Sequence, residues 1–392
     1  MKKRPKKLHP IDQLQRVYIY SKRRSLKTQI LDRLCEEYGL HRKSVVRRLN
    51  QIDKPKKQRT GRKTNYVSDV LLMPLKEIWL ATDLMCGKRL KHAIPLWLPF
   101  YESTSEPLPK KIKSQLLAMS PATIDRLLKS VKIKTKRHGL SGTKPGRLLK
   151  NQIEIKTDHW DVTQPGFIEA DTVAHCGNST AGDFVWSITL TDINSCWTEI
   201  RATWNKGAEG VTEQIKDIEC NLPFILRGFD CDNGSEFLNW HLIRYLKERE
   251  KNAVQVTRSR PYRKNDNAHV EQKNWTHVRH LFGYDRFDSP CLVAMMNDLY
   301  KNEWSLLVNY FYPSMQLETK IKVNSKYRRK YYEPKTPYQR LIESDYVDKK
   351  MKALLKRRFK TLNPFELKKA IETKLKKIFH FVKISNNVRQ RI

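Results

Sequence analysis

The sequence predicts a mixed α/β core that is preceded by all-α units and followed by a basic, mostly helical region. The core prediction rests on three strand patterns in a row, after which helical and strand patterns alternate. Apolar or alternating segments typical of strands lie around 167–172, 182–190, 196–204, 223–230 and 253–257, and helical segments lie at 207–221 and 235–250. On either side of this region the apolar residues recur at helical spacing.

Residues 1–52 are predicted to form a helix-turn-helix unit behind a basic N-terminal arm. The first helix is expected to be capped by Ser25, the turn contains Gly39, and the second helix covers 42–49, with Val46 and Leu49 packed inward. In this interpretation the second helix enters the major groove of DNA. Its candidate DNA contacts are Arg42, Lys43, Arg47 and Arg48. A plain three-helix bundle with a solvated basic face is the alternative.

Two basic linkers, at 53–66 and 132–152, enclose a second helical unit at 67–131. The first linker is charged, contains Pro and Gly, and is expected to follow phosphates through Arg59, Arg62 and Lys63. The second unit contains a predicted Pro-rich bend at 95–109 and a helix that begins at Pro121 after the capping residue Ser120. This last helix resembles recognition helices of helix-turn-helix proteins, with Thr123 and Arg126 as candidate DNA contacts.

The remaining chain divides into a predicted catalytic core at 153–290 and a basic region at 291–392. The second of these contains an aromatic-rich helical segment at 291–312, a basic and aromatic segment at 316–340, and a basic amphipathic helical tail from about 345. This region is expected to bind DNA or to support assembly, and the sequence does not decide between these roles for the tail.

Three acidic residues of the core lie at positions that suit a metal site. Asp171 and Asp232 each follow an apolar run, and Glu271 lies on a helix predicted to begin near Asn267. A single Asp at the end of a strand is more often a turn or cap residue. Carboxylates from separate elements, however, are the ligands that Mg²⁺ prefers, and two such ions about 3.5–4 Å apart can support phosphodiester chemistry.

The sequence motifs around these carboxylates resemble those of a known family. Asp-Asn-Gly-Ser-Glu-Phe at 232–237 and Arg-Pro-Tyr-Arg-Lys-Asn-Asp-Asn-Ala-His-Val-Glu-Gln at 260–272 are similar to DDE transposases and retroviral integrases, above all to integrase-type transposases of bacterial insertion sequences. The resemblance implies a ribonuclease H-like fold and two bound Mg²⁺ ions, with Mn²⁺ as a substitute. It implies Asp171, Asp232 and Glu271 as the catalytic, metal-binding triad. The last two lie 39 positions apart (271 − 232), a little wider than is common in the family.

Cations near Glu271 are candidate phosphate contacts, with an ordinary solvated basic face as the alternative. They are Arg263, Lys264, Lys273 and Arg279. Zinc is disfavoured, because the His175-Cys176 pair and the histidines at 269, 277 and 280 fit no common structural spacing.

The charge of the chain favours a partner with dense phosphates. The 392 residues carry a net charge of +36 (77 basic minus 41 acidic), which fits double-stranded DNA, although a ribosome-associated or generally cationic protein would share it. Seven cysteines without framework spacing, no apolar run that could span a membrane and no signal peptide predict a cytoplasmic protein with reduced thiols. The resemblance to transposases of bacterial insertion sequences implies a bacterial, nucleoid-associated protein.

These observations predict a DNA transposase that binds the terminal inverted repeats of a mobile element, cleaves its 3′ ends and joins them to target DNA. Because two ends must be joined, a homodimer or a higher synaptic assembly is expected. The alternative from another class is a domesticated, non-cleaving DNA-binding regulator. A ribonuclease H or structure-selective nuclease is a third possibility, but it leaves the two N-terminal units without a role.

Overall fold

The computed structural model describes residues 10–50, 66, 68–104, 107–134, 163–231, 237, 240–249, 253–258, 268–323 and 326–389. The chain divides into two compact units, residues 1–65 and 66–392. The division falls within the predicted linker at 53–66. The two units are described separately.

The N-terminal unit contains three helices, α1 (Pro10–Tyr20), α2 (Arg24–Tyr38) and α3 (Arg42–Leu49). Gly39 ends α2 in a left-handed conformation with φ of 61°, which Gly adopts without a Cβ penalty. The predicted cap by Ser25 is wrong, because α2 already begins at Arg24 and Arg23 in the N-cap position makes no side-chain cap. The small core includes Leu34, Val45 and Leu49, so Val45, rather than the half-buried Val46, is the fully buried valine of α3.

The second unit begins with helices α4 (Ser68–Ala81), α5 (Gly87–Thr104), α6 (Lys110–Ala118), α7 (Pro121–Leu127) and α8 (Lys129–Lys134). The bend predicted at 95–109 is wrong for its first part, since α5 continues through Pro95 and Pro99. Each Pro costs a helix about 3 kcal/mol. Burial of Ile94, Trp97 and Leu98 on the same helix offsets this cost at about 1.5–3 kcal/mol per side chain.

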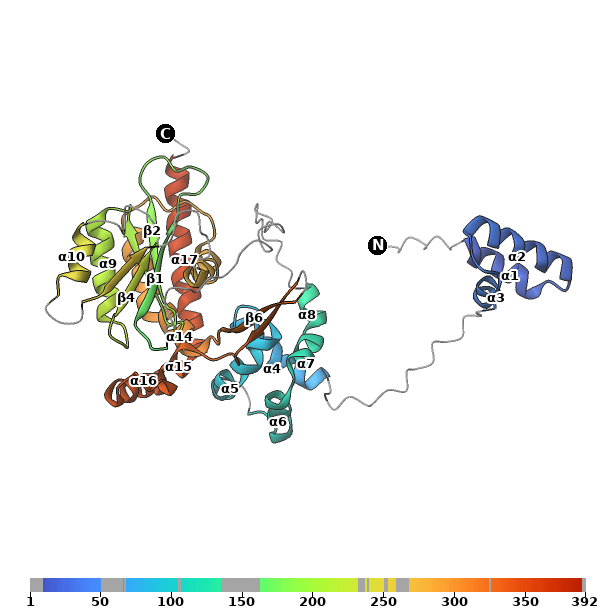
Figure 1. Cartoon of the computed structure of the whole chain (residues 1–392), viewed down its shortest axis with the longest axis horizontal. Helices are drawn as coiled ribbons and strands as arrows, with labels where there is room; N and C mark the ends of the chain where they lie inside the picture. The colour runs from blue at the N-terminus through green and yellow to red at the C-terminus, as the bar shows by residue number, and fades with distance from the viewer. Residues whose placement is uncertain are drawn as a thin grey trace. The chain divides into compact units, whose positions relative to one another are not determined.

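A five-stranded mixed sheet forms the centre of the second unit (Figure 1). Its strands are β1 (Phe167–Ala174), β2 (Val185–Asp192), β3 (Thr198–Trp204), β4 (Gly228–Cys231) and β5 (Gln255–Arg258), in the spatial order β3-β2-β1-β4-β5. The first three strands are antiparallel, and β4 and β5 run parallel to β1. This confirms the predicted mixed α/β sheet and is the order that a ribonuclease H-like fold requires.

Helices α9 (Ala208–Cys220) and α10 (Trp240–Lys247) follow β3 and β4, and both are close to their predicted places. The strand predicted at 223–230 is shorter than expected, because only 228–231 pair with β1 and β5. Phe224 and Leu226 are nevertheless packed in the core. Their apolar pattern therefore indicates burial rather than strand pairing. Pro223 lacks a backbone N–H, which suits the irregular segment between α9 and β4.

The two faces of β1 have different roles. Ile168 and Ala170 face a core that is closed by α9 and α10. The alternate residues, Glu169 and Asp171, therefore lie on the opposite face. That face is covered by the consecutive segments α11 (Ala268–Lys273), the π-helical η2 (Asn274–Arg279) and α12 (His280–Phe282).

The C-terminal part adds α13 (Cys291–Leu299), the π-helical η3 (Tyr300–Trp304), α14 (Ser305–Phe311), the hairpin β6 (Leu317–Val323) and β7 (Lys326–Tyr331), α15 (Pro337–Glu343), α16 (Lys349–Thr361) and α17 (Pro364–Arg389). The hairpin was not predicted. The helices predicted as a separate unit at 67–131 share one hydrophobic cluster with α13, α14 and α17. Trp97 Nε1, for example, donates to the Phe311 carbonyl oxygen at 3.2 Å.

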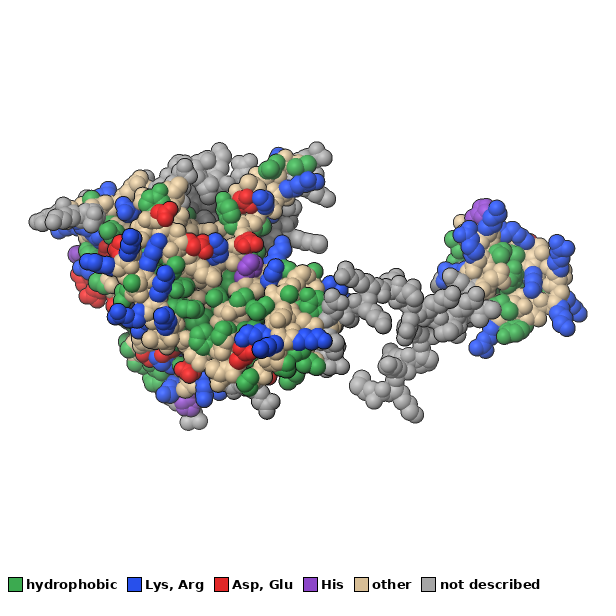
Figure 2. Space-filling view, turned by 90° about the horizontal axis from the view of Figure 1, so that it is seen from below, with side chains coloured by type: hydrophobic (Ala, Val, Ile, Leu, Met, Phe, Trp, Pro, Cys, Tyr) green, Lys and Arg blue, Asp and Glu red, His purple; other side chains and the backbone are tan. Residues whose placement is uncertain are grey.

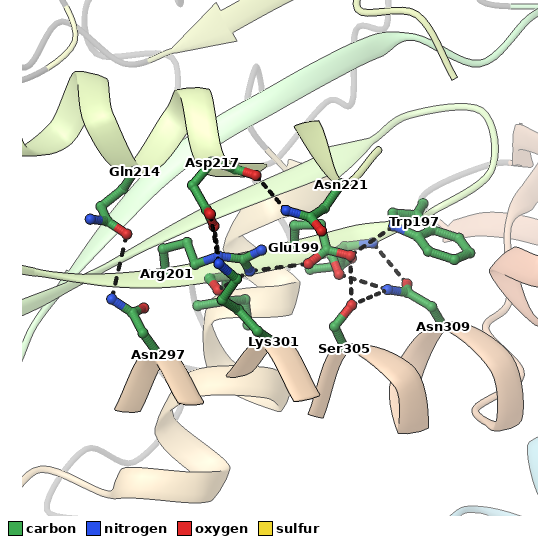
Figure 3. Close-up of polar contacts among 12 residues, drawn as sticks. Trp197, Glu199, Arg201, Gln214, Asp217, Asn221, Asn297, Lys301, Ser305 and Asn309 are labelled. Carbon is green, nitrogen blue, oxygen red and sulfur yellow. Dashed lines mark hydrogen bonds and ion pairs between the residues drawn. The ribbon is translucent and has the colours of Figure 1, made fainter. Parts of the chain in front are cut away.

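A buried ionic network holds β3 to the helices on either side of it (Figure 3). Arg201 Nη1 lies 3.2 Å from Glu199 Oε2, and its Nε lies 2.6 Å from Asp217 Oδ2 of α9. Lys301 Nζ reaches the other oxygen of Asp217 at 2.6 Å, and Ser305 Oγ donates to Glu199. Although burial alone would raise it, these hydrogen bonds from Lys301 and Arg201 hold the pKa of Asp217 below its usual value. Within the described part of the chain, no helix has the length and apolar character of a membrane span.

Candidate active site

Asp171 lies in β1 on the sheet face that is covered by α11 and η2, and its side chain is partly exposed. Its Oδ1 accepts a hydrogen bond from the backbone N–H of Thr172 at 2.7 Å. Its Oδ2 accepts one from Asn274 Nδ2 at 2.6 Å. Both oxygens are thus oriented by neighbouring groups while the carboxylate keeps access to solvent.

The bond from Asn274 also defines the relation between Asp171 and Glu271. Glu271 is exposed and lies on α11, three residues before Asn274. Residues three apart in a helix share a face, with Cβ atoms about 5–6 Å from each other. The helix carrying Glu271 is therefore attached to β1 at Asp171, which holds the segments of the two predicted metal ligands together.

Glu169 provides a second attachment of this helix. Its side chain is buried, and its Oε2 accepts the backbone N–H of Val270 at 3.0 Å. Val270 is the third residue of α11, so this N–H is one of those that a helix leaves without an internal partner. A carboxylate at a helix N-terminus is also favoured by the helix dipole. Glu169 thus fixes the start of the helix that presents Glu271.

Asp232, the remaining member of the predicted triad, lies outside the described residues. The residues immediately before the two aspartates, Ala170 and Cys231, are paired in register between β1 and β4. The residues two positions before each aspartate, Glu169 and Asp230, are also paired. Asp230 accepts a hydrogen bond from Thr257 Oγ1 at 2.6 Å. These paired positions of the two central strands therefore bring carboxylates onto one face of the sheet.

The donor set at this place is chemically suited to Mg²⁺. Asp171 and Glu271 supply hard carboxylate oxygens from two separate elements, and both side chains have access to solvent. Among the described residues, no group of three or more Asp, Glu, His or Cys side chains is placed to hold a metal ion. The third predicted ligand, Asp232, lies outside them.

Lys273 differs from what the sequence suggested. Lys273 follows Glu271 by two residues, so it lies on a different side of the helix. It is partly buried, and burial is the main reason that the pKa of its ammonium falls to about 8. The charges of Arg89 and Arg340 lower this pKa further, whereas Cys196 raises it. Lys273 is therefore directed into the protein rather than toward a surface beside Glu271.

Arg279 is also used within the fold. Its guanidinium lies over the ring of Tyr284, 4.7 Å from the centroid, and its Nη1 donates to the Gly283 carbonyl oxygen at 3.3 Å. Burial lowers its pKa. The candidate phosphate contacts Arg263 and Lys264 lie outside the described residues.

The histidines weighed for zinc have other surroundings. His175 is buried, its Nε2 is 2.8 Å from Ser187 Oγ, and its ring packs against Phe287. Burial lowers the pKa of His175 to about 3, so this ring is neutral at physiological pH. His277 is buried against Trp304.

The candidate DNA contacts of the N-terminal unit lie on the surface of α3. Lys43, Arg47 and Arg48 are exposed, whereas Arg42 is exposed but forms an ion pair with Asp32 of α2. The linker contacts Arg59, Arg62 and Lys63 lie outside the described residues. That α3 enters a DNA groove stays a prediction.

The corresponding candidates in the second unit lie on α7. Ser120 caps this helix as predicted, accepting from the Thr123 N–H at 3.2 Å. Thr123 Oγ1 is 3.0 Å from Ser120 Oγ, and Arg126 is exposed. That they contact DNA also stays a prediction.

Two residues of the site, Asn274 and Glu169, were missed by sequence reasoning. The signals that could have found them are positional. Glu169 precedes Asp171 by two residues and so shares its face of the strand, and Asn274 follows Glu271 by three and so shares its face of the helix. These two spacings place Glu169 beside Asp171 and Asn274 beside Glu271, whereas the contact between strand and helix is seen only in the structure.

Comparison with known proteins gives one clear relative. The chain is 33% identical over 324 residues to the uncharacterized protein y4rM of Sinorhizobium fredii (strain NBRC 101917 / NGR234), and the match covers 81% of this chain and 90% of that protein. The chain belongs to the family of y4rM. No protein-family model matches the chain. Membership of the y4rM family does not assign a reaction, because y4rM is itself uncharacterized.

Two solved structures have partial similarity. The catalytic core domain of BIV integrase is 16% identical, with 46% of this chain and 96% of that chain covered and a TM-score of 0.28. A chain of the cryoEM structure of the simian T-cell lymphotropic virus intasome in complex with PP2A regulatory subunit B56 gamma is 13% identical, with coverages of 56% and 82% and a TM-score of 0.32. At such low TM-scores, the fold assignment rests on the strand order and register described above.

Removal of the Asn274 amide provides a test of this site. We expect Asn274→Ala to slow DNA cleavage about 10- to 100-fold, because a hydrogen bond to a charged group contributes about 1.5–3 kcal/mol. The Mg²⁺ concentration that gives half-maximal rate should rise as well, since Asp171 loses its orientation. A Mg²⁺ titration of the cleavage rate measures both effects.

The matched control is Asn302→Ala. Asn302 is an exposed residue of η3 whose Nδ2 likewise donates to a carboxylate, Asp298 Oδ1, at 2.7 Å. Its loss should change neither the rate nor the Mg²⁺ requirement. Equal behaviour of the two variants would show that Asn274 has no particular role in the site.

Proposed function

We propose that this protein is a DNA transposase that cleaves the 3′ ends of a mobile element and joins them to target DNA. The observation that carries the proposal is the hydrogen bond from Asn274 to Asp171, which holds the helix of Glu271 against the central strand of a sheet with ribonuclease H-like order. The sequence motifs at 232–237 and 260–272 support the same activity. Terminal inverted repeats, target DNA and a second protomer are the proposed partners.

The triad would hold the metal ions through Asp171, Asp232 and Glu271. Two Mg²⁺ ions bound there would supply activation of the attacking oxygen and stabilisation of the leaving one. The roles of the other residues follow from their contacts. Asn274 orients the Asp171 carboxylate, and Glu169 holds the first turn of α11, so the separation between Asp171 and Glu271 is set before DNA arrives. The reaction needs no covalent intermediate with a Ser, Tyr or Cys side chain.

The distribution of charge supports DNA as the substrate. The net charge is +36, and on the face seen in Figure 2 Lys and Arg side chains lie around patches of apolar side chains. In the N-terminal unit, the exposed cations Lys43, Arg47 and Arg48 would contact the element ends. Such contacts position DNA for a site whose own residues are acidic.

The decisive experiment is an insertion assay in cells, with a marked DNA segment bounded by the repeats that flank the gene. We expect new insertions with the wild-type protein. With the purified protein, we expect 3′-end cleavage that stops when EDTA removes divalent ions and returns with Mg²⁺, because the proposed carboxylates act through the metal ions that they hold.

The control is the same DNA segment with both repeats scrambled, which should give neither insertions nor cleavage. If the repeats are protected in footprints but never cut, the protein is a non-cleaving regulator and the proposal is wrong. Cleavage of RNA–DNA hybrids without insertion would instead indicate a ribonuclease.

A further inference from the structure

The hairpin formed by β6 and β7, here called the ribbon, has exposed side chains on both of its faces. Thr319, Ile321, Arg328 and Arg329 are all exposed, and Ile321 retains 60% of its accessible surface. A two-stranded hairpin is at best marginally stable on its own. The exposed faces of the ribbon are therefore available to a partner.

The base of the ribbon, by contrast, is attached to the catalytic sheet. Ser314 and Lys335 exchange backbone hydrogen bonds of 2.9 and 3.3 Å. Gln316 Nε2 donates to the Asn194 carbonyl oxygen, in the turn between β2 and β3, at 2.6 Å, and Arg340 Nη2 donates to the Ser314 carbonyl oxygen at 2.7 Å. The ribbon thus has a fixed position relative to the sheet that carries Asp171.

The ribbon is densely cationic on both faces. Its two strands contain six cations and one acid, Glu318, which pairs with Lys330 at 2.8 Å. Lys320 and Arg329 are directly opposite each other in the register, and like charges in this arrangement are destabilising. Neighbouring phosphates would relieve this repulsion, whereas a second cationic ribbon from another protomer would increase it.

The size of the ribbon fits a groove of duplex DNA. Two paired strands are about 4.8 Å apart, and six or seven residues extend about 20 Å. The major groove, about 12 Å wide, admits a two-stranded ribbon. Directly paired residues share a face, so Lys320, Lys322 and Arg329 lie on one face and Arg328 lies with Ile321 on the other. Cations on both faces can reach the phosphate backbones on both sides of a groove.

We propose that the ribbon is a docking arm that lies in the major groove of DNA next to the DNA held at the catalytic sheet. This inference deepens the proposed function and rests on it for the identity of the DNA. Its test measures binding, so a protein that binds through the ribbon but never cuts would separate the two proposals.

The test replaces four ribbon cations, as K320Q, K322Q, R328Q and R329Q in one full-length protein. Each phosphate contact contributes about 0.9 to the slope of log affinity against log salt, so losing four should lower that slope by about 3.6. The fall in affinity for duplex DNA between 50 and 200 mM salt should then become about 10²-fold smaller than for the wild type. Circular dichroism and thermal melting check that the variant is folded.

The matched control makes the same change of charge on α16, as K349Q, K350Q, K356Q and R357Q, four exposed residues outside the ribbon. A specific ribbon contact predicts a much smaller change in this protein. Equal slopes for the two variants would mean that total charge decides binding and would overturn the proposal.

Chemical acetylation of lysines in the wild-type complex gives a measurement without substitutions. We expect duplex DNA to protect Lys320 and Lys322 from acetylation and single-stranded DNA to protect them less. Unchanged acetylation with duplex DNA, or equal protection by single strands, would contradict a groove-docking ribbon.

Discussion

Replacing Glu271 with Gln is expected to reduce DNA cleavage and strand transfer by about 10⁴-fold, in the range of losses seen when an essential catalytic group is removed. The substitution keeps the size of the side chain but removes the negative charge that a metal ligand needs. Because Glu271 is exposed and belongs to neither of the proposed DNA-reading helices α3 and α7, DNA binding and stability should be retained. Cleavage of a labelled repeat, together with a binding titration on the same DNA, measures both properties.

Glu213→Gln is the matched control for this variant. Glu213 is likewise an exposed glutamate on a helix, but α9 lies on the other side of the sheet, against the core that contains Ile168 and Ala170. It should cleave like the wild type. If Glu271→Gln still cleaves at a comparable rate, Glu271 is not a metal ligand and the triad must be assigned differently.

The sequence was sufficient to predict the mixed sheet, the strand that contains Asp171 and the helix that contains Glu271, because each depends on local patterns. Strands such as β2 and β3 alternate or carry buried apolar runs, and Glu271 follows a recognisable motif. Asn274 and Glu169 were not predicted because each acts across a distance of about 100 residues in sequence, Asn274 on Asp171 and Glu169 on the Val270 N–H. No pattern within one element reports such a contact.

Other features of the structure differ from the sequence predictions because tertiary packing outweighs the local conformational preference of single residues. Pro95 and Pro99 are strong helix breakers in isolation, yet α5 retains its helix around the buried Trp97. Lys273 lies two residues from the proposed metal ligand Glu271 in sequence, but helical geometry turns it into the protein, where burial lowers its pKa. The ribbon was not predicted, because its many cations suggest a solvated loop. The pairing of β6 with β7 is seen only in the structure.

Beyond the site itself, the five-stranded sheet depends on the buried charges of its outer strand. β3 lies at one edge of the sheet, and Glu199 and Arg201 are both almost fully buried there. Their partners come from α9 on one side and from the helices that follow α13 on the other (Figure 3). On the same strand, the side-chain amides of Asn309 and Asn297 bond the backbone N–H and carbonyl groups of Thr198 and Ala202, so these edge groups are not open to another chain. Burying these charges costs free energy, but the ion pairs and hydrogen bonds of the network fix the position of β3.

Arg201→Met is consequently expected to destabilise the protein by about 3–5 kcal/mol, since it leaves the carboxylate of Glu199 buried without its cation. Domains are stable by only about 5–15 kcal/mol, so much of the second unit should unfold at lower urea concentration. Urea unfolding followed by circular dichroism measures the change. The control Arg244→Met breaks an exposed pair with Glu248 and should cost about 0–1 kcal/mol.

The double variant Glu199→Gln with Arg201→Met separates the buried charge from the lost packing. Gln can still accept the hydrogen bonds that Glu199 receives from Trp197 Nε1 at 3.0 Å and from Ser305 Oγ at 2.5 Å, but it carries no charge to bury. If unpaired charge is the cause, the double variant should recover a large part of the stability that Arg201→Met loses. If it is as unstable as the single variant, the guanidinium acts through packing and through its bond to Asp217, and the ionic interpretation of the network is wrong.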